Sequence, residues 1–308
     1  MRLIVIALLF QALSAPDPAQ MEKAPDLGYK PVPHGLAIPE HVTLGASASV
    51  AVTPDGHLVL FNRGRVPLLE FDAEGRFVRS LDKAEYTRPH GLRIDRAGNI
   101  WTTDVAGHTV TKMNPRGEVQ LVLGVKGQSG EWNEAAKTRL LNEPTDVGFG
   151  PSGDIFVTTG HGQAVPRVMR FDRNGTLIRS WGGKGAAPGQ FDVAHSVVVD
   201  GKGLVYVADR QNRRVQIFDV DGNFIKTWPF AGLPCGLSIA RDGQMYLVTG
   251  FAGQILKLDA NGKALAATGQ PGKALGEFGE AHYVAFGPRD EIYVADPVKP
   301  ELHKFVKR

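Results

Sequence analysis

The sequence predicts an all-β fold, a six-bladed β-propeller, and three observations support this prediction. A glycine-marked turn recurs at intervals of roughly 40–55 residues, which is the repeat length of propeller blades. Each repeat carries short alternating strands, and no segment has the pattern of a long amphipathic helix. The chain has 308 residues, 43% of them hydrophobic, which is enough for one large core.

Every repeat has the same order of elements. An apolar inner strand leads to a turn such as Thr53-Pro54-Asp55-Gly56, and a second strand follows, as at 58–61. A loop then leads to a third strand that ends in Phe-Asp, as at Phe71-Asp72, before a fourth strand such as 77–81. Strands of this length joined by Asp-Gly and Asn-Gly turns indicate antiparallel hairpins.

The ring of repeats is expected to close with both ends of the chain. The repeats begin near residues 48, 90, 145, 195, 235 and 282, and we interpret 21–308 as one domain. The sixth repeat has room for only three strands. We expect its fourth strand within Gly28–Pro39, because such closure removes an exposed sheet edge.

Residues 1–20 have the pattern of an export signal. Arg2 precedes the apolar run Leu3–Phe10, and small residues follow. The run is too short to span a bilayer, so we expect a secreted or periplasmic protein without a membrane span after processing. The net charge of +3 is spread along the chain, which argues against a nucleic-acid partner.

Three histidines occupy one structural register. The turn positions are Gly56, Gly98, Gly153, Gly203, Gly243 and, in the sixth repeat, Asp290. The residues eight positions upstream are Ala48, His90, Thr145, His195, Cys235 and His282. Alternate blades lie a third of a turn apart, so three imidazoles converge on the axis and predict a catalytic zinc site with an open position. The alternative is a ring of polar side chains around a wet channel.

The repeat resembles the NHL repeat family. Gln190-Phe191 and the stretch Val207–Phe218 carry this likeness. Within that family the chain resembles the peptidyl-α-hydroxyglycine α-amidating lyases, the lyase part of peptidylglycine α-amidating enzymes. The segments that carry the closer likeness are Asn62-Arg63-Gly64, Trp101–His108, Asn142–Val147, His195-Ser196 and Ala208-Asp209-Arg210.

The resemblance implies a reaction and a set of site residues. The lyases split a peptidyl-α-hydroxyglycine into a peptide amide and glyoxylate. Their zinc ligands correspond to His90, His195 and His282, and two arginines near the metal correspond to Arg63 and Arg210. A guanidinium binds a carboxylate through two parallel hydrogen bonds, which suits the glyoxylyl group. The alternative for Arg210 is an ion pair between blades, for example with Asp209 or Asp172.

The chain departs from the lyases at two positions. The catalytic tyrosine of the family corresponds to His161, which we expect to act as the base; the alternative is an exposed loop residue. The family's calcium is held partly by backbone carbonyls that correspond to Val50 and Leu92. The aspartate that completes that site corresponds to Tyr283, and carbonyls alone hold calcium weakly, so zinc is the expected metal.

Three further residues have two interpretations each. Asp104 and His108 follow the second strand of blade 2. They either orient a metal-binding imidazole through a hydrogen bond or hold a loop in place, and we favour the structural role in the loop. Cys235, the only cysteine, is either a fourth ligand or reactive thiol, or inert packing.

The sequence therefore favours a zinc-dependent, lyase-like enzyme. Its substrate would be a small peptidyl- or acyl-α-hydroxyglycine. One alternative is a non-catalytic NHL-propeller binding module, since fold alone does not decide function. Another is a different metal-dependent propeller hydrolase of the lactonase type, which typically needs carboxylate ligands that this register lacks.

Overall fold

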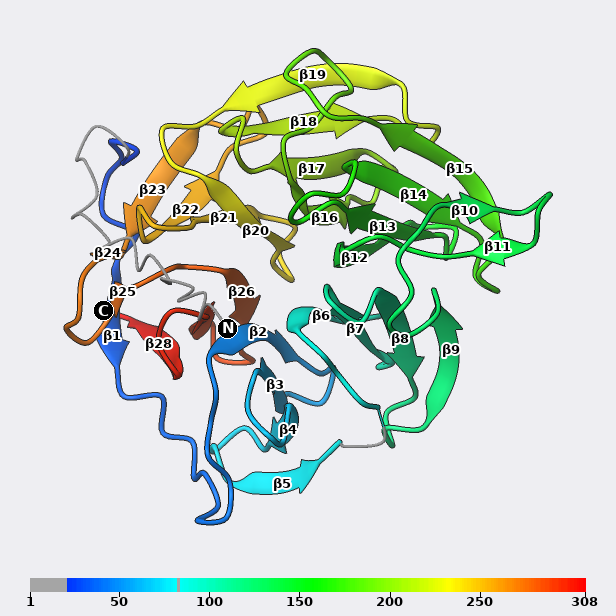
Figure 1. Cartoon of the computed structure of the whole chain (residues 1–308). Helices are drawn as coiled ribbons and strands as arrows, with labels where there is room; N and C mark the ends of the chain where they lie inside the picture. Colours follow the sequence, from blue (N-terminus) through cyan, green and yellow to red (C-terminus); the bar gives the residue numbers. More distant parts are fainter. Residues whose placement is uncertain (1–20, 82–83) are drawn as a thin grey trace, which may run out of the picture.

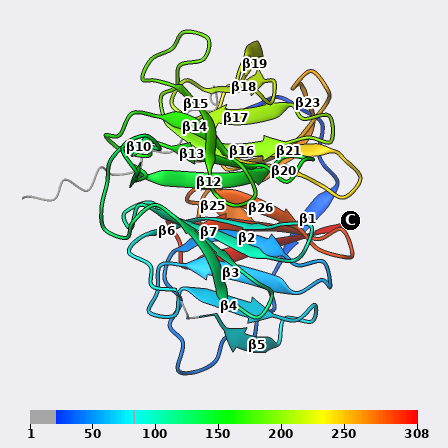
Figure 2. The same ribbon diagram turned by 90° about the vertical axis from the view of Figure 1, so that its right-hand side faces the viewer.

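The computed structural model describes residues 21–81 and 84–308, so the predicted signal segment 1–20 lies outside the described residues. In this part the chain is all β, and six four-stranded sheets surround a central axis (Figure 1). A view from the side places the sheet β16–β19 opposite the sheet β2–β5, with β19 and β5 farthest from the middle (Figure 2). None of the described residues form a helix long and apolar enough to cross a membrane.

Five sheets follow the chain, with their strands in sequence order from the axis outward. Blade 1 consists of β2 (Ser47–Val52), β3 (Leu58–Asn62), β4 (Leu68–Phe71) and β5 (Phe77–Ser80), and blade 2 of β6 (Pro89–Ile94), β7 (Ile100–Asp104), β8 (Thr109–Met113) and β9 (Val119–Leu123). Blade 3 consists of β12 (Pro144–Phe149), β13 (Ile155–Thr159), β14 (Arg167–Phe171) and β15 (Leu177–Gly182), and blade 4 of β16 (Ala194–Val199), β17 (Val205–Asp209), β18 (Arg214–Phe218) and β19 (Phe224–Pro229). Blade 5 consists of β20 (Pro234–Ile239), β21 (Met245–Thr249), β22 (Gln254–Leu258) and β23 (Ala264–Thr268). Two short pairs lie in loops: β10 (Trp132–Asn133) with β11 (Thr138–Arg139), and β24 (Gln270–Pro271) with β25 (Glu277–Phe278).

The sixth sheet combines both ends of the described chain. Its order is β26 (Tyr283–Phe286), β27 (Ile292–Asp296), β28 (Glu301–Lys307) and β1 (Tyr29–Val32). β1 runs antiparallel to β28, with Tyr29 opposite Lys307. The predicted propeller and its closure by an N-terminal strand are therefore confirmed.

The hydrophobic core lies between neighbouring blades. In one cluster Ile217 and Trp228 of blade 4 pack with Leu237 and Leu247 of blade 5. The same arrangement continues across the closure, where Tyr293 of blade 6 belongs to one cluster with residues of blade 1. Each blade therefore buries its apolar faces against its neighbours, as in other repeat proteins.

The turn positions adopt the conformation that their glycines allow. Gly56, Gly98 and Gly203 have φ of 90°, 80° and 86°, in the left-handed region where a side chain is strained. Asp290 takes this place in blade 6 with φ of 63°. Aspartate tolerates that region better than most residues, so the sixth turn keeps the same geometry without glycine.

A β-bulge marks the register position of the inner strands. In the pairing of β6 with β7, the register shifts between Pro89 and Leu92. In the pairing of β16 with β17, it shifts between Ala194 and Ser196. His90 and His195 thus lie at the skipped positions. Because a bulge takes a residue out of the regular alternation and changes the direction of its side chain, it explains how His90 and His195 reach the axis. His282 lies just before β26, where the pairing has no bulge.

The closing strand provides a test of ring stability. Phe305 on β28 is 1% exposed and stacks near Phe278, with ring centroids 5.9 Å apart. We expect Phe305→Ala to lower the free energy of unfolding by about 3–5 kcal/mol, because the truncation leaves a cavity in the seam. Urea unfolding of the purified protein measures this change. Leu275→Ala, at a side chain that is 58% exposed, should change it by less than about 0.5 kcal/mol.

Candidate metal centre

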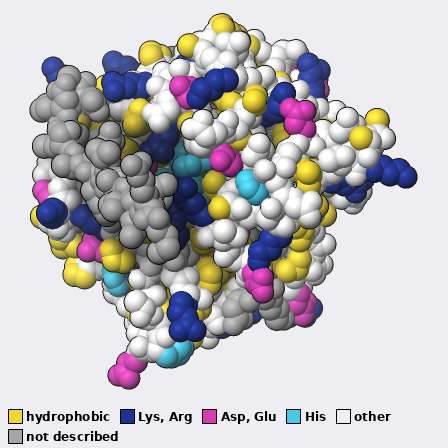
Figure 3. Space-filling view, viewed as in Figure 1, with side chains coloured by type: hydrophobic (Ala, Val, Ile, Leu, Met, Phe, Trp, Pro, Cys, Tyr) yellow, Lys and Arg dark blue, Asp and Glu magenta, His cyan; other side chains and the backbone are white. Residues whose placement is uncertain are grey.

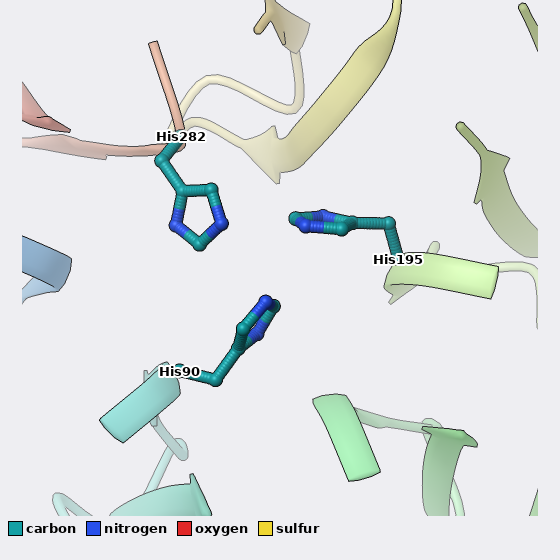
Figure 4. A group of neighbouring side chains, drawn as sticks. All are labelled: His90, His195 and His282. Atoms are coloured by element: carbon teal, nitrogen blue, oxygen red, sulfur yellow. The ribbon is translucent and has the colours of Figure 1, made fainter. Parts of the chain in front are cut away.

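Three imidazole rings from three alternate blades meet on the axis. The ring centroids of His90, His195 and His282 are 4.8, 4.8 and 4.9 Å apart, which is close to an equilateral triangle. Figure 4 shows the three rings pointing toward a common centre. Their potential ligand atoms all lie within 4.8 Å of one another. Donor atoms this close together suit a single metal ion.

Hydrogen bonds orient each ring so that one nitrogen is left for a ligand. The Nδ1 atoms of His90, His195 and His282 donate to the carbonyls of Thr145, Cys235 and Ala48, at 2.8, 2.9 and 2.7 Å. A carbonyl only accepts, so Nδ1 carries the proton and Nε2 keeps its lone pair.

The Nε2 atoms of His90 and His195 are buried and have no hydrogen-bond partner among the described residues. A buried nitrogen without a partner costs free energy, and coordination of a metal removes that cost. Burial also lowers the pKa of all three imidazoles well below the usual value, with a further contribution from neighbouring positive charge. Neutral imidazole is the form that binds metal, so the three residues fit a divalent ion.

His161 lies over the triad, and the structure does not place it in an exposed loop as the alternative interpretation would require. Its ring centroid is 4.7 Å from that of His90 and 5.7 Å from that of His195. Burial, with the charges of Arg210, Arg88 and Arg63, lowers the pKa of His161 to about 3. The ring is therefore neutral near pH 7, with one unprotonated nitrogen.

The two predicted arginines lie in different electrostatic surroundings. Arg63 is half-buried and donates from Nε to the carbonyl of Pro89 at 3.2 Å, and it forms no ion pair with a described carboxylate. Arg210 pairs with the carboxylate of Glu280, and both side chains are only 11% exposed. Arg210 thus forms an ion pair with another part of the ring, as the alternative interpretation expects, but its partner is Glu280, just before β26, and not Asp209 or Asp172. Of these two guanidinium groups, that of Arg63 has no described carboxylate partner and is available for an external anion.

Asp104 and His108 hold loops. Asp104 accepts hydrogen bonds from the backbone N–H groups of Thr87, Arg88 and Gly107, at 2.6, 2.7 and 2.9 Å. His108 Nδ1 accepts one from a backbone N–H in the loop before blade 3. The carbonyls named above, and not these two side chains, orient the ligand imidazoles. Asp104 fixes the segment that leads into His90.

Cys235 contributes its backbone to the centre. Its carbonyl accepts from His195 Nδ1, whereas its Sγ lies 3.9 Å from Glu280 Oε1. The group of described side chains that can share one ion consists of the three histidines and does not include this thiol. Burial raises the pKa of Cys235 to about 12, which keeps the thiol protonated near pH 7 and makes it a poor ligand or nucleophile.

The sequence analysis did not identify three charged residues near the site, Glu280, Arg93 and Asp146. Glu280 lies two positions before His282, where the alternation of an extended chain places both side chains on one side. Arg93 and Asp146 are opposite charges within the apolar inner strands of blades 2 and 3, joined by an ion pair. A charged residue in an otherwise apolar inner strand is the signal that identifies Arg93 and Asp146.

One face of the propeller is hollowed near its middle. In the space-filling view the middle of the face is hollowed, with a histidine side chain visible in it and Lys or Arg side chains around it (Figure 3). The positive charge of these side chains favours an anion there.

The fold and the centre together define a β-propeller with a three-histidine candidate metal site on its axis. A model of the NHL repeat matches residues 191–218. The human NHL repeat-containing protein 3 is 30% identical, over 86% of this chain and 74% of that protein. The chain belongs to the NHL-repeat protein family.

Other relatives are amidating enzymes, which the chain resembles. Peptidyl-glycine alpha-amidating monooxygenase A of Xenopus laevis is 36% identical over 64% of this chain, which spans only 22% of that protein. Peptidyl-alpha-hydroxyglycine alpha-amidating lyase 1 of Drosophila melanogaster is 29% identical over 87% of this chain and 58% of its own length. Among solved structures, a streptogramin B lyase superposes with a TM-score of 0.63 at 16% identity, covering 91% of this chain and 98% of that one. That last likeness concerns the fold alone.

Proposed function

We propose that the protein is a zinc-dependent lyase that cleaves a peptidyl- or acyl-α-hydroxyglycine to the corresponding amide and glyoxylate. The observation that carries this proposal is the triad His90, His195 and His282, in which the buried Nε2 atoms of His90 and His195 have no partner among the described residues. The positive charge of the half-buried Arg63 acts on His282. The likeness to enzymes named for this reaction supports it. We also propose that the protein acts outside the cytoplasm, in keeping with the export pattern of residues 1–20.

Arg63 binds the carboxylate of the hydroxyglycine. The guanidinium has no described carboxylate partner, and a carboxylate gains two charge-assisted hydrogen bonds there. Arg210 adds positive charge, but its guanidinium group is already paired with Glu280. The substrate is thereby oriented with its hydroxyl toward the three histidines.

A divalent ion held by the triad would supply Lewis acidity toward the substrate hydroxyl. His161 accepts the hydroxyl proton as the carbon–oxygen double bond of glyoxylate forms and the carbon–nitrogen bond breaks. The electron pair of that bond goes to the amide nitrogen, which receives a proton in turn. Because the pKa of His161 is lowered to about 3, its imidazole is a weak base, and this transfer requires a hydroxyl group made more acidic, as a bound divalent ion would do. The imidazolium then gives the proton to the amide nitrogen, so no proton is consumed.

The test of this function is glyoxylate release from α-hydroxyhippurate by zinc-loaded protein. We expect glyoxylate and benzamide in equal amounts. Zinc-loaded protein that releases neither would contradict the proposal and would indicate a binding module.

His161→Ala should lower kcat about 100- to 10,000-fold, the range for loss of a general base. Zinc content should stay at the wild-type level, since His161 is not one of the three ligands. Gln163→Ala, an exposed position in the same loop, serves as the control. An unchanged kcat in His161→Ala would remove this residue from the mechanism.

A further inference from the structure

The tunnel below the triad does not fit the calcium ion that the resemblance implies. Val50 and Leu92, the expected carbonyl ligands, line a cavity of about 200 Å³, and Arg93 lines the same cavity. The acidic ligand is replaced by Tyr283, which offers a phenol in place of a carboxylate. A second cation there would meet a guanidinium at close range and would lack an anionic oxygen.

Arg93 connects five of the six inner strands. Its Nε donates to Asp146 Oδ1 at 3.0 Å, and its Nη2 donates to Asp146 Oδ2 at 2.5 Å. Nη2 also lies 3.1 Å from Ser196 Oγ and 2.9 Å from the carbonyl of Leu237. The guanidinium carbon lies 5.4 Å from the centre of the Tyr283 ring. β6, β12, β16, β20 and β26 are thus joined around one positive charge.

Asp146 is saturated by partners of this chain. Besides the two bonds from Arg93, its Oδ2 accepts from Ser196 Oγ at 2.7 Å and from the N–H of Val197 at 3.1 Å. Its Oδ1 accepts from the N–H of Val147 at 2.9 Å. Asp146 is completely buried, and the side chain of Arg93 is 15% exposed. A buried pair with every oxygen satisfied is a built site for the guanidinium, not an accidental contact.

This network lies directly beneath the histidines. Asp146 follows Thr145, whose carbonyl orients His90; Ser196 follows His195; and Tyr283 follows His282. The Tyr283 hydroxyl is 3.1 Å from the carbonyls of Thr145 and of His195. A shift of Arg93 or its partners would therefore move the backbone groups that aim the rings.

We propose that Arg93 is a built-in cation that takes the place of calcium in the tunnel and positions the metal-binding histidines from below. The residue does not touch the metal or the substrate, so it is a positioning residue. The inference depends on the triad holding a metal and not on the lyase reaction, so each can fail without the other.

The first experiment measures calcium. Zinc-loaded protein is dialysed against calcium chloride, and its calcium content and melting temperature are compared with those of calcium-free protein. We expect no stoichiometric calcium and no shift of the melting temperature. One bound calcium per chain, with a rise in melting temperature, would overturn the proposal.

The second experiment measures zinc affinity in variants. Arg93→Gln removes the positive charge, whereas Arg93→Lys keeps the charge but loses the planar guanidinium group. Each variant should bind zinc about 10- to 100-fold more weakly, because substitutions that disturb the partners of metal-binding histidines weaken metal binding by this amount. Arg170→Gln is the matched control, because the side chain of Arg170, in β14, is 16% exposed and pairs with Asp154 away from the inner strands. It should lose stability and keep its zinc affinity. Equal zinc affinity in Arg93→Lys, Arg170→Gln and the wild type would contradict the positioning role.

Discussion

His195→Ala is expected to bind zinc too weakly for the metal to survive gel filtration, and to release glyoxylate at the background rate. Removal of partners outside the ligand set already weakens metal sites by ~10–100-fold, so loss of an imidazole should exceed that range. His195 is fully buried at its bulge, and no other described side chain of its blade belongs to the group that can share the ion. Zinc content by mass spectrometry, together with the glyoxylate assay, measures both effects.

The control for this variant is His41→Ala, at an exposed histidine outside the register. It should keep zinc and activity. His195→Ala with full zinc content would show that the triad is not the binding site. Zinc loss with unchanged glyoxylate release would instead separate the reaction from the metal.

Arg63→Ala is expected to lower kcat/KM for α-hydroxyhippurate about 10- to 100-fold, since a hydrogen bond to a charged group contributes about 1.5–3 kcal/mol. Its guanidinium has no carboxylate partner in the described chain, so removing it leaves no buried charge behind. Arg63→Lys should recover only part of the loss, because an ammonium cannot form the two parallel bonds. Steady-state kinetics with the free acid measure the change.

The methyl ester of the same substrate separates charge recognition from other effects. The ester lacks the carboxylate, so wild type and Arg63→Ala should differ little with it. Arg65→Ala, at the exposed arginine two residues along the loop, should match the wild type on both substrates. An equal loss of kcat/KM with the acid and with the ester would show that Arg63 does not bind the carboxylate.

Much of the fold could be predicted because its signals are local and repeated. The turn at Gly56 recurs in every blade, with Asp290 in the sixth, and a missing fourth strand in the last repeat implies a strand from the other end. β1 over Tyr29–Val32 meets that expectation. The triad could be predicted for the same reason, because equivalent positions on alternate blades converge on the axis.

The partners of the site residues could not be predicted because they depend on contacts across the tunnel. Glu280, 70 residues from Arg210 in the chain, occupies that guanidinium. Arg93 and Asp146 are 53 residues apart, and no repeat rule pairs positions that differ from blade to blade. Bulges at His90 and His195, and not a simple alternation of strand residues, direct these two rings, whereas His282 lies just before β26. The sequence pattern therefore did not reveal how the rings reach the axis.

The most direct measurement is the zinc X-ray absorption spectrum of the purified, zinc-loaded protein, with the metal content of the same sample. Three imidazoles that share one ion predict about one zinc per chain, with nitrogen or oxygen neighbours at about 2.0–2.1 Å and no sulfur. Absence of bound zinc, or a sulfur neighbour at about 2.3 Å, would contradict the three-histidine centre.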